Sequence, residues 1–240
     1  MNVYRLIICS FIAICLSMTA DARTYLVSVG ISDYPGTRND LHLPVNDATA
    51  MKIIYSKNSD AETVLLTNAN ATKSAILSAL RQTFSKASDN DIIVFFFSGH
   101  GCPGAFCAHD NTLPYADIRV VMAASKAKNK MIFADACFSG KMRQGRQNGG
   151  QQSFSKYNIL LFLSSRSEET SIERGGMKNG FFTSCLQKGL RGGADKNKDR
   201  IITAKELFTY VRNGVRNLSC DKQHPVMWGK FDDNMPVIKW

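Results

Sequence analysis

The chain has 240 residues, of which 44% are hydrophobic and 10% aromatic, and its formal net charge is +10. The length suits one domain of ordinary size, and the composition excludes a largely disordered or low-complexity protein. The basic residues are dispersed and are not interleaved with aromatic residues, so we expect no nucleic-acid partner. The two densest basic patches are interpreted as solvated loops, Lys141–Arg146 and Lys196–Arg200.

Residues 1–22 are expected to be a secretory signal peptide. Arg5 is followed by the apolar run Leu6–Met18 and then by Ala20-Asp21-Ala22, a small-x-small cleavage signature. The run is shorter than the ~20 residues that a helix needs to cross a bilayer. We therefore expect an exported protein, periplasmic or secreted, with no stable membrane anchor after cleavage and with a mature domain over residues 23–240.

Short runs rich in Val, Ile, Phe and Leu predict strands that are buried on both faces. These runs are Thr24–Ile31, Glu62–Leu66, Asp91–Phe97, Lys130–Ala134 and Tyr157–Leu163. Segments with helical periodicity lie between and after these strands. The predicted helices are Ala48–Tyr55, a helix that is capped by Thr72 and includes Ile76 to Phe84, Ala116–Ala127, and a late helix from Thr203. This order predicts an α/β sandwich with a mostly parallel central sheet and helices on both faces.

Two of these strands lead into reactive side chains at their carboxyl ends, where ligands bind in parallel sheets. FFFSGHG delivers His100 and IFADACFSG delivers Cys137. An imidazole beside a thiol can take its proton and later protonate a leaving amine, which favours a Cys137 and His100 dyad. The backbone amides of Gly101 and Cys137 would then stabilise an oxyanion. The alternative is that Cys137 is a core thiol and His100 a loop residue with a structural role.

The motifs SGHG and DACFSG resemble those of the caspase-like cysteine peptidases, and more closely those of the metacaspases and their bacterial relatives. GISDY, LPVNDA, SSRSEETSIE and NGFFTSCLQKGL follow the order of that family along most of the chain. The resemblance implies a caspase-like three-layer sandwich and peptide hydrolysis through an acyl-enzyme on Cys137. Animal caspases have Gln-Ala-Cys around the nucleophile and a histidine about 50 residues upstream. Here Asp135 precedes Ala136-Cys137, which points away from true caspases.

The resemblance also implies a pocket for the residue before the scissile bond, lined by Asp47, Ser98 and Asp135. Asp135 lies two residues before Cys137, so on a strand both side chains point to one side. Two carboxylates favour a guanidinium and repel an acidic side chain, which predicts polypeptide substrates that are cleaved after Arg or Lys. The alternative roles are a helix cap for Asp47 and a loop tether for Asp135. Pro44 stands where the family often has cysteine.

A possible calcium site lies in DKNKDRIITAKE, an EF-hand-like loop. Its candidate ligands at positions 1, 3, 5, 7, 9 and 12 are Asp195, Asn197, Asp199, Ile201, Thr203 and Glu206. Arg200 occupies the sixth position, where glycine normally makes the sharp turn. The alternative is an acidic loop that caps the following helix, and we expect neither a metal nor another cofactor.

The expected mature chain keeps five cysteines, an odd number that leaves one thiol outside any disulfide. Cys137 is the candidate nucleophile, and the other four have an undetermined pairing; these are Cys102, Cys107, Cys185 and Cys220. A possible zinc site is formed by Cys102, Cys107, His109 and Asp110, but the spacing of these residues is uncommon among zinc sites. An exported location favours a disulfide there instead.

The polar loop Lys141–Lys156 contains Lys141, Arg143 and Arg146, after which a basic-specific peptidase would cut itself, although the loop is equally consistent with a plain connector. The sequence therefore predicts an exported cysteine endopeptidase. A binding or regulatory module that keeps the same fold without turnover is the alternative, because a fold alone does not establish an activity.

Overall fold

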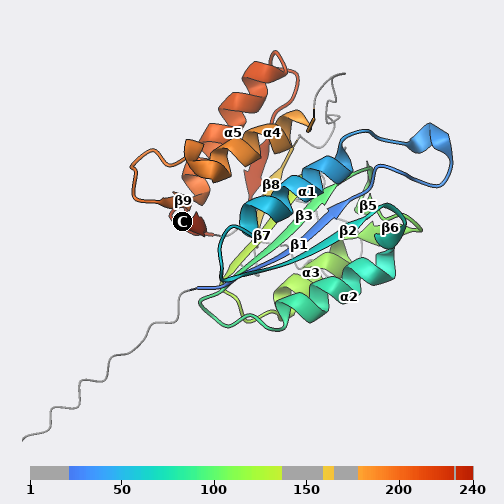
Figure 1. Cartoon of the computed structure of the whole chain (residues 1–240), viewed down its shortest axis with the longest axis horizontal. Helices are drawn as coiled ribbons and strands as arrows, with labels where there is room; N and C mark the ends of the chain where they lie inside the picture. Colours follow the sequence, from blue (N-terminus) through green and yellow to red (C-terminus); the bar gives the residue numbers. More distant parts are fainter. Residues whose placement is uncertain (1–21, 137–158, 165–177, 230, 240) are drawn as a thin grey trace, which may run out of the picture.

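The computed structural model describes residues 22–136, 159–164, 178–229 and 231–239, and it shows a six-stranded sheet between two layers of helices (Figure 1). The strand order is β10-β8-β7-β3-β1-β2, with β10 antiparallel to β8 and the other neighbours parallel. The strands are β1 (Thr24–Gly30), β2 (Ala61–Thr67), β3 (Ile92–Ser98), β7 (Asn129–Asp135), β8 (Ile159–Leu163) and β10 (Val226–Trp228).

The helices cover both faces of this sheet, as Figure 1 shows. One face carries α1 (Pro44–Tyr55), α4 (Phe181–Lys188) and α5 (Ala204–Leu218). The other carries α2 (Lys73–Phe84) and α3 (Tyr115–Ala124). The predicted α/β sandwich, with its mostly parallel sheet, is therefore confirmed. No helix within the described ranges is both long and apolar enough to cross a membrane.

Smaller elements surround the main sheet. One is a three-stranded sheet of β4 (Gly101–Cys102), β5 (Ala105–Cys107) and β6 (Thr112–Pro114). Another is a two-stranded sheet of β9 (Ile201–Thr203) and β11 (Pro236–Lys239). Short helical turns are η1 (Thr37–Asn39), η2 (Asn68–Asn70) and η5 (Gly189–Gly193). The first of these sheets follows β3 directly, so it begins one residue after His100.

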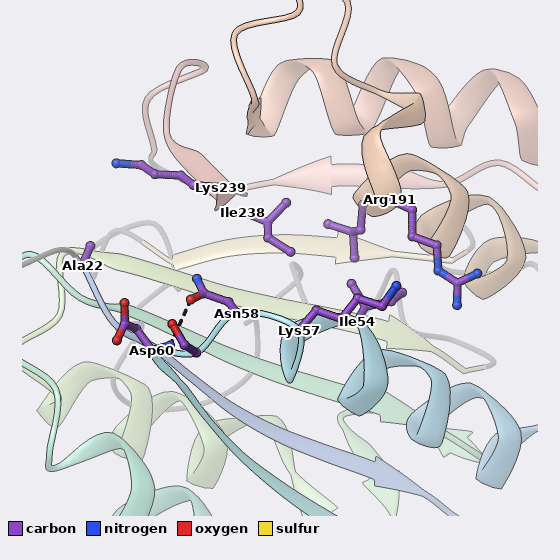
Figure 2. A pocket seen from close by; sticks show the side chains of 10 residues that line it. Ala22, Ile54, Lys57, Asn58, Asp60, Arg191, Ile238 and Lys239 are labelled. Carbon is purple, nitrogen blue, oxygen red and sulfur yellow. Dashed lines mark hydrogen bonds between the residues drawn. The ribbon is translucent and has the colours of Figure 1, made fainter.

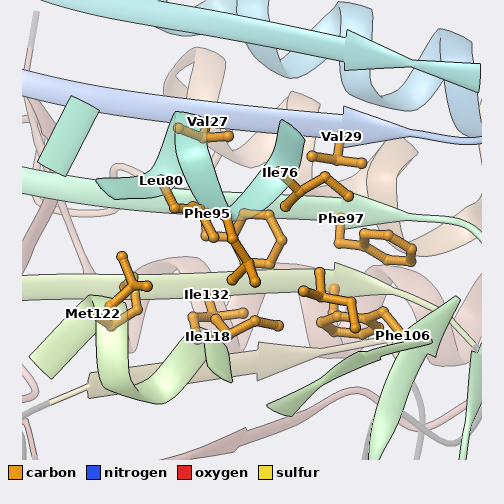
Figure 3. Close-up of a cluster of buried hydrophobic side chains, with 14 of the residues drawn as sticks. Val27, Val29, Ile76, Leu80, Phe95, Phe97, Phe106, Ile118, Met122 and Ile132 are labelled. Atoms are coloured by element: carbon orange, nitrogen blue, oxygen red, sulfur yellow. The ribbon is translucent and has the colours of Figure 1, made fainter. Parts of the chain in front are cut away.

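The aromatic run in β3 fills both cores by alternating its side chains. Phe95 and Phe97 are buried toward α2 and α3 (Figure 3), whereas Phe96 is buried toward α1 and α4. Phe97 stacks on Phe106 of β5 with ring centroids 4.3 Å apart. This stacking ties the hairpin that follows His100 to the central strand, because buried aromatic pairs contribute beyond their area alone.

Two helix boundaries differ by three residues or more from those that the sequence predicts. α1 begins at Pro44 rather than Ala48. Proline is tolerated at this position, because the N–H that it lacks would have no partner within the first turn of the helix. α3 ends at Ala124 rather than Ala127. There the ammonium of Lys130 lies 2.9 Å from the carbonyl oxygen of Met122 and 2.7 Å from that of Ser125, so it binds the carbonyl groups at the end of the helix.

The carboxyl ends of three strands place one residue each in a row. Gly30 of β1 is the register partner of Ser98 in β3, and Ser98 is the partner of Asp135 in β7. A methyl group at Gly30 would lie 2.2 Å from the carbonyl oxygen of Pro44, so only glycine allows α1 to approach β1 this closely. The N-terminal turn of α1 consequently lies over the row, beside Ser98 and Asp135.

Candidate active site

Asp47 in the first turn of α1 is buried beside the row of strand ends. Its side chain is 1% exposed and accepts hydrogen bonds at both oxygens. Ser98 Oγ donates to Oδ2 at 2.9 Å, while Asn179 Nδ2 and the Gly180 N–H donate to Oδ1 at 2.8 and 3.2 Å. α1 has no side-chain cap, since Leu43 precedes it. Asp47 therefore joins α1 to β3 and to the segment before α4 instead of capping its own helix.

Asp135 at the end of β7 is the second buried carboxylate, and its residue is 7% exposed. Its Oδ2 accepts hydrogen bonds from Thr183 Oγ1 at 2.9 Å and from the Thr183 N–H at 3.3 Å. A methyl group at Gly180 would lie 2.7 Å from this oxygen and 3.6 Å from Asp47 Oδ2. The backbone at Gly180 is thus packed between the two carboxylates, which shows that the predicted trio of Asp47, Ser98 and Asp135 is brought together.

The two carboxylates interact unfavourably with each other. Burial, and after it the negative charge of Asp135, raises the pKa of Asp47 well above the usual aspartate value, while the three hydrogen bonds that Asp47 accepts act in the opposite direction. The N-terminus of α4 points toward this pair, and the partial positive charge of a helix N-terminus favours nearby anions. A guanidinium or ammonium group placed here would relieve the remaining repulsion.

His100 lies at the neighbouring strand end, two residues beyond Ser98. The preceding residue, Gly99, donates its N–H to the carbonyl oxygen of Asp135 at 3.3 Å, so the turn that carries His100 lies against the end of β7. The imidazole is partly exposed, and its Nε2 lies 2.7 Å from the carbonyl oxygen of Asn39. A carbonyl can only accept, so Nε2 carries a proton and Nδ1 is the basic nitrogen of the neutral ring.

Tyr34 fixes the backbone of the same turn. Its hydroxyl accepts a hydrogen bond from the His100 N–H at 2.9 Å and donates one to the carbonyl oxygen of Cys107 at 3.0 Å. The rings of Tyr34 and His100 have centroids 4.8 Å apart. Burial raises the pKa of Tyr34, so the hydroxyl stays protonated and keeps both hydrogen bonds. A methyl group at Gly99 would lie 2.6 Å from this hydroxyl, which explains the glycine before His100.

Cys137, the predicted nucleophile, lies outside the described residues, and so does the loop Lys141–Lys156. The described chain reaches Ala136, whose N–H is 3.3 Å from Ser164 Oγ in the segment after β8. Gly101, the other predicted oxyanion donor, is half-buried at the start of β4 and directly follows His100. Of the predicted site, the structure thus describes His100 and the trio of Asp47, Ser98 and Asp135.

The EF-hand-like loop has a different organisation around its carboxylates. Asp195 accepts hydrogen bonds from the Lys198 and Arg200 N–H groups, and Glu206 forms a capping box with Thr203 at the start of α5. Arg200 has φ +66°, in the left-handed region that favours glycine. Within the described residues, no group of three or more His, Cys, Asp or Glu side chains is arranged to hold a metal ion.

The four cysteines that the structure describes are present as thiols, and these are Cys102, Cys107, Cys185 and Cys220. Asp110, part of the cluster whose spacing disfavours a zinc site, accepts a hydrogen bond from the Lys73 N–H at the start of α2. Burial raises the pKa of Cys185 to about 11, so this thiol is a poor nucleophile at neutral pH. These features leave the strand ends at His100 and Asp135 as the candidate active site.

A pocket lies at the end of the sheet where β1 and β2 begin, opposite the candidate site, and its lining is of a different chemical type (Figure 2). Its volume is about 590 Å³, and it lies where β1 and β2 begin, far along both strands from Gly30. Apolar side chains of Ile54, Leu190 and Ile238 line it together with the charged groups of Lys57, Asp60, Arg191 and Lys239. The described residues that line it include no cysteine or histidine, so this pocket contains neither type of residue in the predicted dyad.

Comparison with known proteins agrees with this arrangement. Residues 23–235 match the family model described as Caspase domain. The chain belongs to the caspase-domain family. It is 32% identical over 133 residues to metacaspase-9 of Arabidopsis thaliana, an alignment that covers 45% of this chain and 41% of that relative. The chain thus matches less than half the length of this curated relative.

Two solved structures share the caspase-like fold at low sequence identity. A protein from Geobacter sulfurreducens has a TM-score of 0.64 and 14% identity, with coverage of 86% of this chain and 92% of that one. Caspase-1 from Spodoptera frugiperda has a TM-score of 0.64 and 17% identity, with coverage of 88% and 87%. These two structures confirm the caspase-like fold, and the family match confirms the resemblance to caspase-like peptidases.

Several residues of this caspase-domain site are not assigned by sequence reasoning. Asn39 contributes a backbone carbonyl, which carries no side-chain signal, and Tyr34 lies three residues after a strand prediction ends. Asn179, Gly180 and Thr183 lie within NGFFTSCLQKGL, a segment that the family resemblance includes without giving its residues roles. Their link to Asp47 and Asp135 spans 132 and 48 residues of chain, beyond the reach of local patterns.

We expect Asp47→Asn to stabilise the folded protein at neutral pH. Asparagine keeps an acceptor for Asn179 and removes one of two buried like charges. The melting temperature should rise by a few degrees, since about 1 kcal/mol shifts the Tm of a domain of this size by ~2–4 °C. The folded-state pKa of Asp47 lies above the ordinary value of 3.8, so its contribution to stability is full below 3.8 and is lost as pH rises through the raised value. The Tm gain should therefore shrink on acidification.

Asp91→Asn is the matched control for this thermal measurement. Burial acts to raise the pKa of Asp91, but hydrogen bonds from Ser88 and Arg23 outweigh it and lower the pKa. The contribution of Asp91 to stability is thus present above 3.8 and is lost as pH falls through the lowered value. Asp91→Asn should lower the Tm at neutral pH. An equal loss of Tm in both variants would contradict the assignment of repulsion to the Asp47 site.

Proposed function

We propose that the protein is an exported cysteine endopeptidase that cleaves polypeptides after Arg or Lys with a Cys137 and His100 dyad. The observation that carries the proposal is the pair of buried carboxylates, Asp47 and Asp135, next to the strand end that leads into Cys137. A pocket with two carboxylates selects a cationic side chain through charged hydrogen bonds. Family membership supports the peptidase chemistry, and the carboxylates support the basic preference.

The proposed reaction begins with proton transfer from the Cys137 thiol to the imidazole of His100. The Asn39 carbonyl supports this role, because it holds the Nε2 proton and directs Nδ1 to act as the base. The thiolate attacks the scissile carbonyl carbon, the C–N bond breaks, and the imidazolium protonates the departing amine. Water, activated by His100, then hydrolyses the thioester and releases the new carboxyl terminus, which restores the thiol. The Gly101 and Cys137 amides would stabilise the oxyanion in both steps.

Asp135 is the better placed of the two carboxylates for direct contact with a substrate side chain. It is more exposed than Asp47, at 7% against 1%, and it lies two residues before Cys137. Both oxygens of Asp47 are already engaged by Ser98 and by the Asn179–Gly180 segment. Asp47 would therefore add charge and order to the pocket, while Asp135 would contact the guanidinium or ammonium group.

Cys137→Ala and His100→Ala should each abolish peptide hydrolysis and leave the fold intact. The two residues act as one unit, so the double variant should be about as inactive as either single variant, rather than showing the product of two losses. Initial rates with a basic fluorogenic peptide and circular dichroism measure activity and folding together. Turnover by folded Cys137→Ala protein would contradict the mechanism. If Cys137 in the wild-type protein does not react with a thiol-directed probe, a non-catalytic module is favoured instead.

Peptides that differ only in the residue before the scissile bond should be cleaved in the order Arg, then Lys, with no cleavage after Asp. Asp135→Ala should lose most of the activity toward basic peptides, and Asp47→Ala somewhat less, because Asp135 makes the proposed direct contact. The values of kcat/KM for matched fluorogenic peptides measure both effects. Efficient cleavage after Asp, or unchanged rates when both carboxylates are removed, would overturn the pocket assignment.

Self-cleavage in the Lys141–Lys156 loop is expected from the same specificity. Incubated wild-type protein should be cut after Lys141, Arg143 or Arg146, whereas Cys137→Ala protein should stay intact. Intact-mass spectrometry of both proteins distinguishes the outcomes, and addition of active protein to the inactive variant tests cleavage between molecules. Identical masses for the two proteins after incubation would show that the loop is only a connector under those conditions.

A further inference from the structure

The N-terminal segment of α4 holds both carboxylates of the pocket. Asn179 and the Gly180 N–H bind Asp47, while the hydroxyl and N–H of Thr183 bind Asp135. Thr183 is fully buried, and its Oγ1 lies 2.9 Å from Asp135 Oδ2. Three turn and helix residues thus approach the pocket from the side opposite the strands, and each donates a hydrogen bond to a carboxylate oxygen.

The hydroxyl of Thr183 fixes the rotation of the Asp135 carboxylate. The side-chain and backbone donors of Thr183 converge on the same oxygen, and Gly180 packs against that oxygen with no room for a methyl group. A carboxylate held at one oxygen by two donors has a defined plane. The orientation of that plane matters to a planar guanidinium, whose N–H groups form a rigid fork, more than to the compact ammonium of lysine.

We propose that Thr183 is a positioning residue that orients Asp135 and thereby sets the preference for Arg over Lys. The inference rests on the proposed basic specificity and adds to it a residue that does not itself touch the substrate. Removal of the hydroxyl leaves the Thr183 N–H as the remaining donor from this residue, at 3.3 Å, and allows the carboxylate to rotate. Cleavage after Arg should suffer more than cleavage after Lys, because only the fork requires the aligned plane.

The decisive variants are Thr183→Val, which keeps the shape of the side chain, and Thr183→Ser, which keeps the hydroxyl. For Thr183→Val we expect kcat/KM on an Arg peptide to fall about tenfold, as for loss of one hydrogen bond to a charged group, mainly through a higher KM. The matched Lys peptide should lose no more than about threefold, because an ammonium group is less sensitive to the orientation of the carboxylate. Thr183→Ser should retain the wild-type ratio of Arg to Lys cleavage.

Thr83→Val is the matched control, since Thr83 is also a buried helical threonine but lies in α2 on the other face of the sheet. It should leave the Arg to Lys ratio unchanged. Labelling of Cys137 by iodoacetamide should be equal in all variants, which separates loss of positioning from a general loss of the site. If Thr183→Val does not fold, Gly180→Ala provides the second test, because its methyl group would displace the same carboxylate oxygen.

An unchanged Arg to Lys ratio in folded Thr183→Val protein would overturn this inference, and so would an equal loss on both peptides. In both cases the proposed function stands if the wild-type protein cleaves after basic residues. Wild-type protein that labels at Cys137 and cleaves neither peptide would overturn the proposed specificity, and the role of Thr183 with it. The two failures are therefore distinguished by the wild-type rates alone.

Discussion

Two like-charged carboxylates, Asp47 and Asp135, are buried at the carboxyl edge of the sheet, and the surrounding elements compensate for that burial. An ionised carboxylate loses its hydration when it is buried, and a second one nearby adds repulsion. Donors from two separate parts of the chain offset this loss, since Ser98 at the end of β3 and the segment Asn179–Thr183 at the start of α4 direct N–H or O–H groups at the pair. The folded protein thus retains an unfavourable interaction between the carboxylates. Under the proposed function, a cationic side chain of the substrate would bind carboxylates that are already desolvated and oriented, as electrostatic preorganisation requires.

Glycines at two positions, Gly30 and Gly180, make this arrangement possible. Gly30 occupies the β1 position of the row, where a methyl group would collide with the backbone of Pro44, and Gly180 occupies the gap between the carboxylates. α1 can therefore settle on the strand ends from one direction and the segment before α4 from another. A backbone that approaches this closely also brings its own N–H groups within reach of the carboxylates. The same glycines that permit the packing thus permit the hydrogen bonds, which links the shape of the sandwich to the charge that it buries.

Local patterns in the sequence predict five strands of the main sheet and the helices α1, α2, α3 and α5, but they predict neither β10 nor α4. The family motifs indicate Ser98 and Asp135, whereas the register that pairs them cannot be read from strands whose residues are buried on both faces. The start of α1 was missed because Pro44 was not included in the helical period, although proline is compatible with a first turn. Thr183 could not be assigned a role, because its partner lies 48 residues away and nothing in a threonine near a helix start distinguishes such a contact. Asn39 contributes a backbone atom, which any residue could supply in its place.

His100 and the carboxylate pair are supported by opposite layers of the sandwich. Tyr34, which holds the turn of His100, packs into the core beneath α2 and α3, and Gly99 lies against Phe97 in that same core. Asp47 and the donors around it belong to α1 and α4, whose apolar residues form the other core. The sheet separates these two packed clusters, whereas the strand ends join them, because the Gly99 N–H donates to the Asp135 carbonyl oxygen at 3.3 Å. The side chains that support His100 and those that support the carboxylates therefore belong to different cores, while both groups share the backbone at one edge of the same sheet.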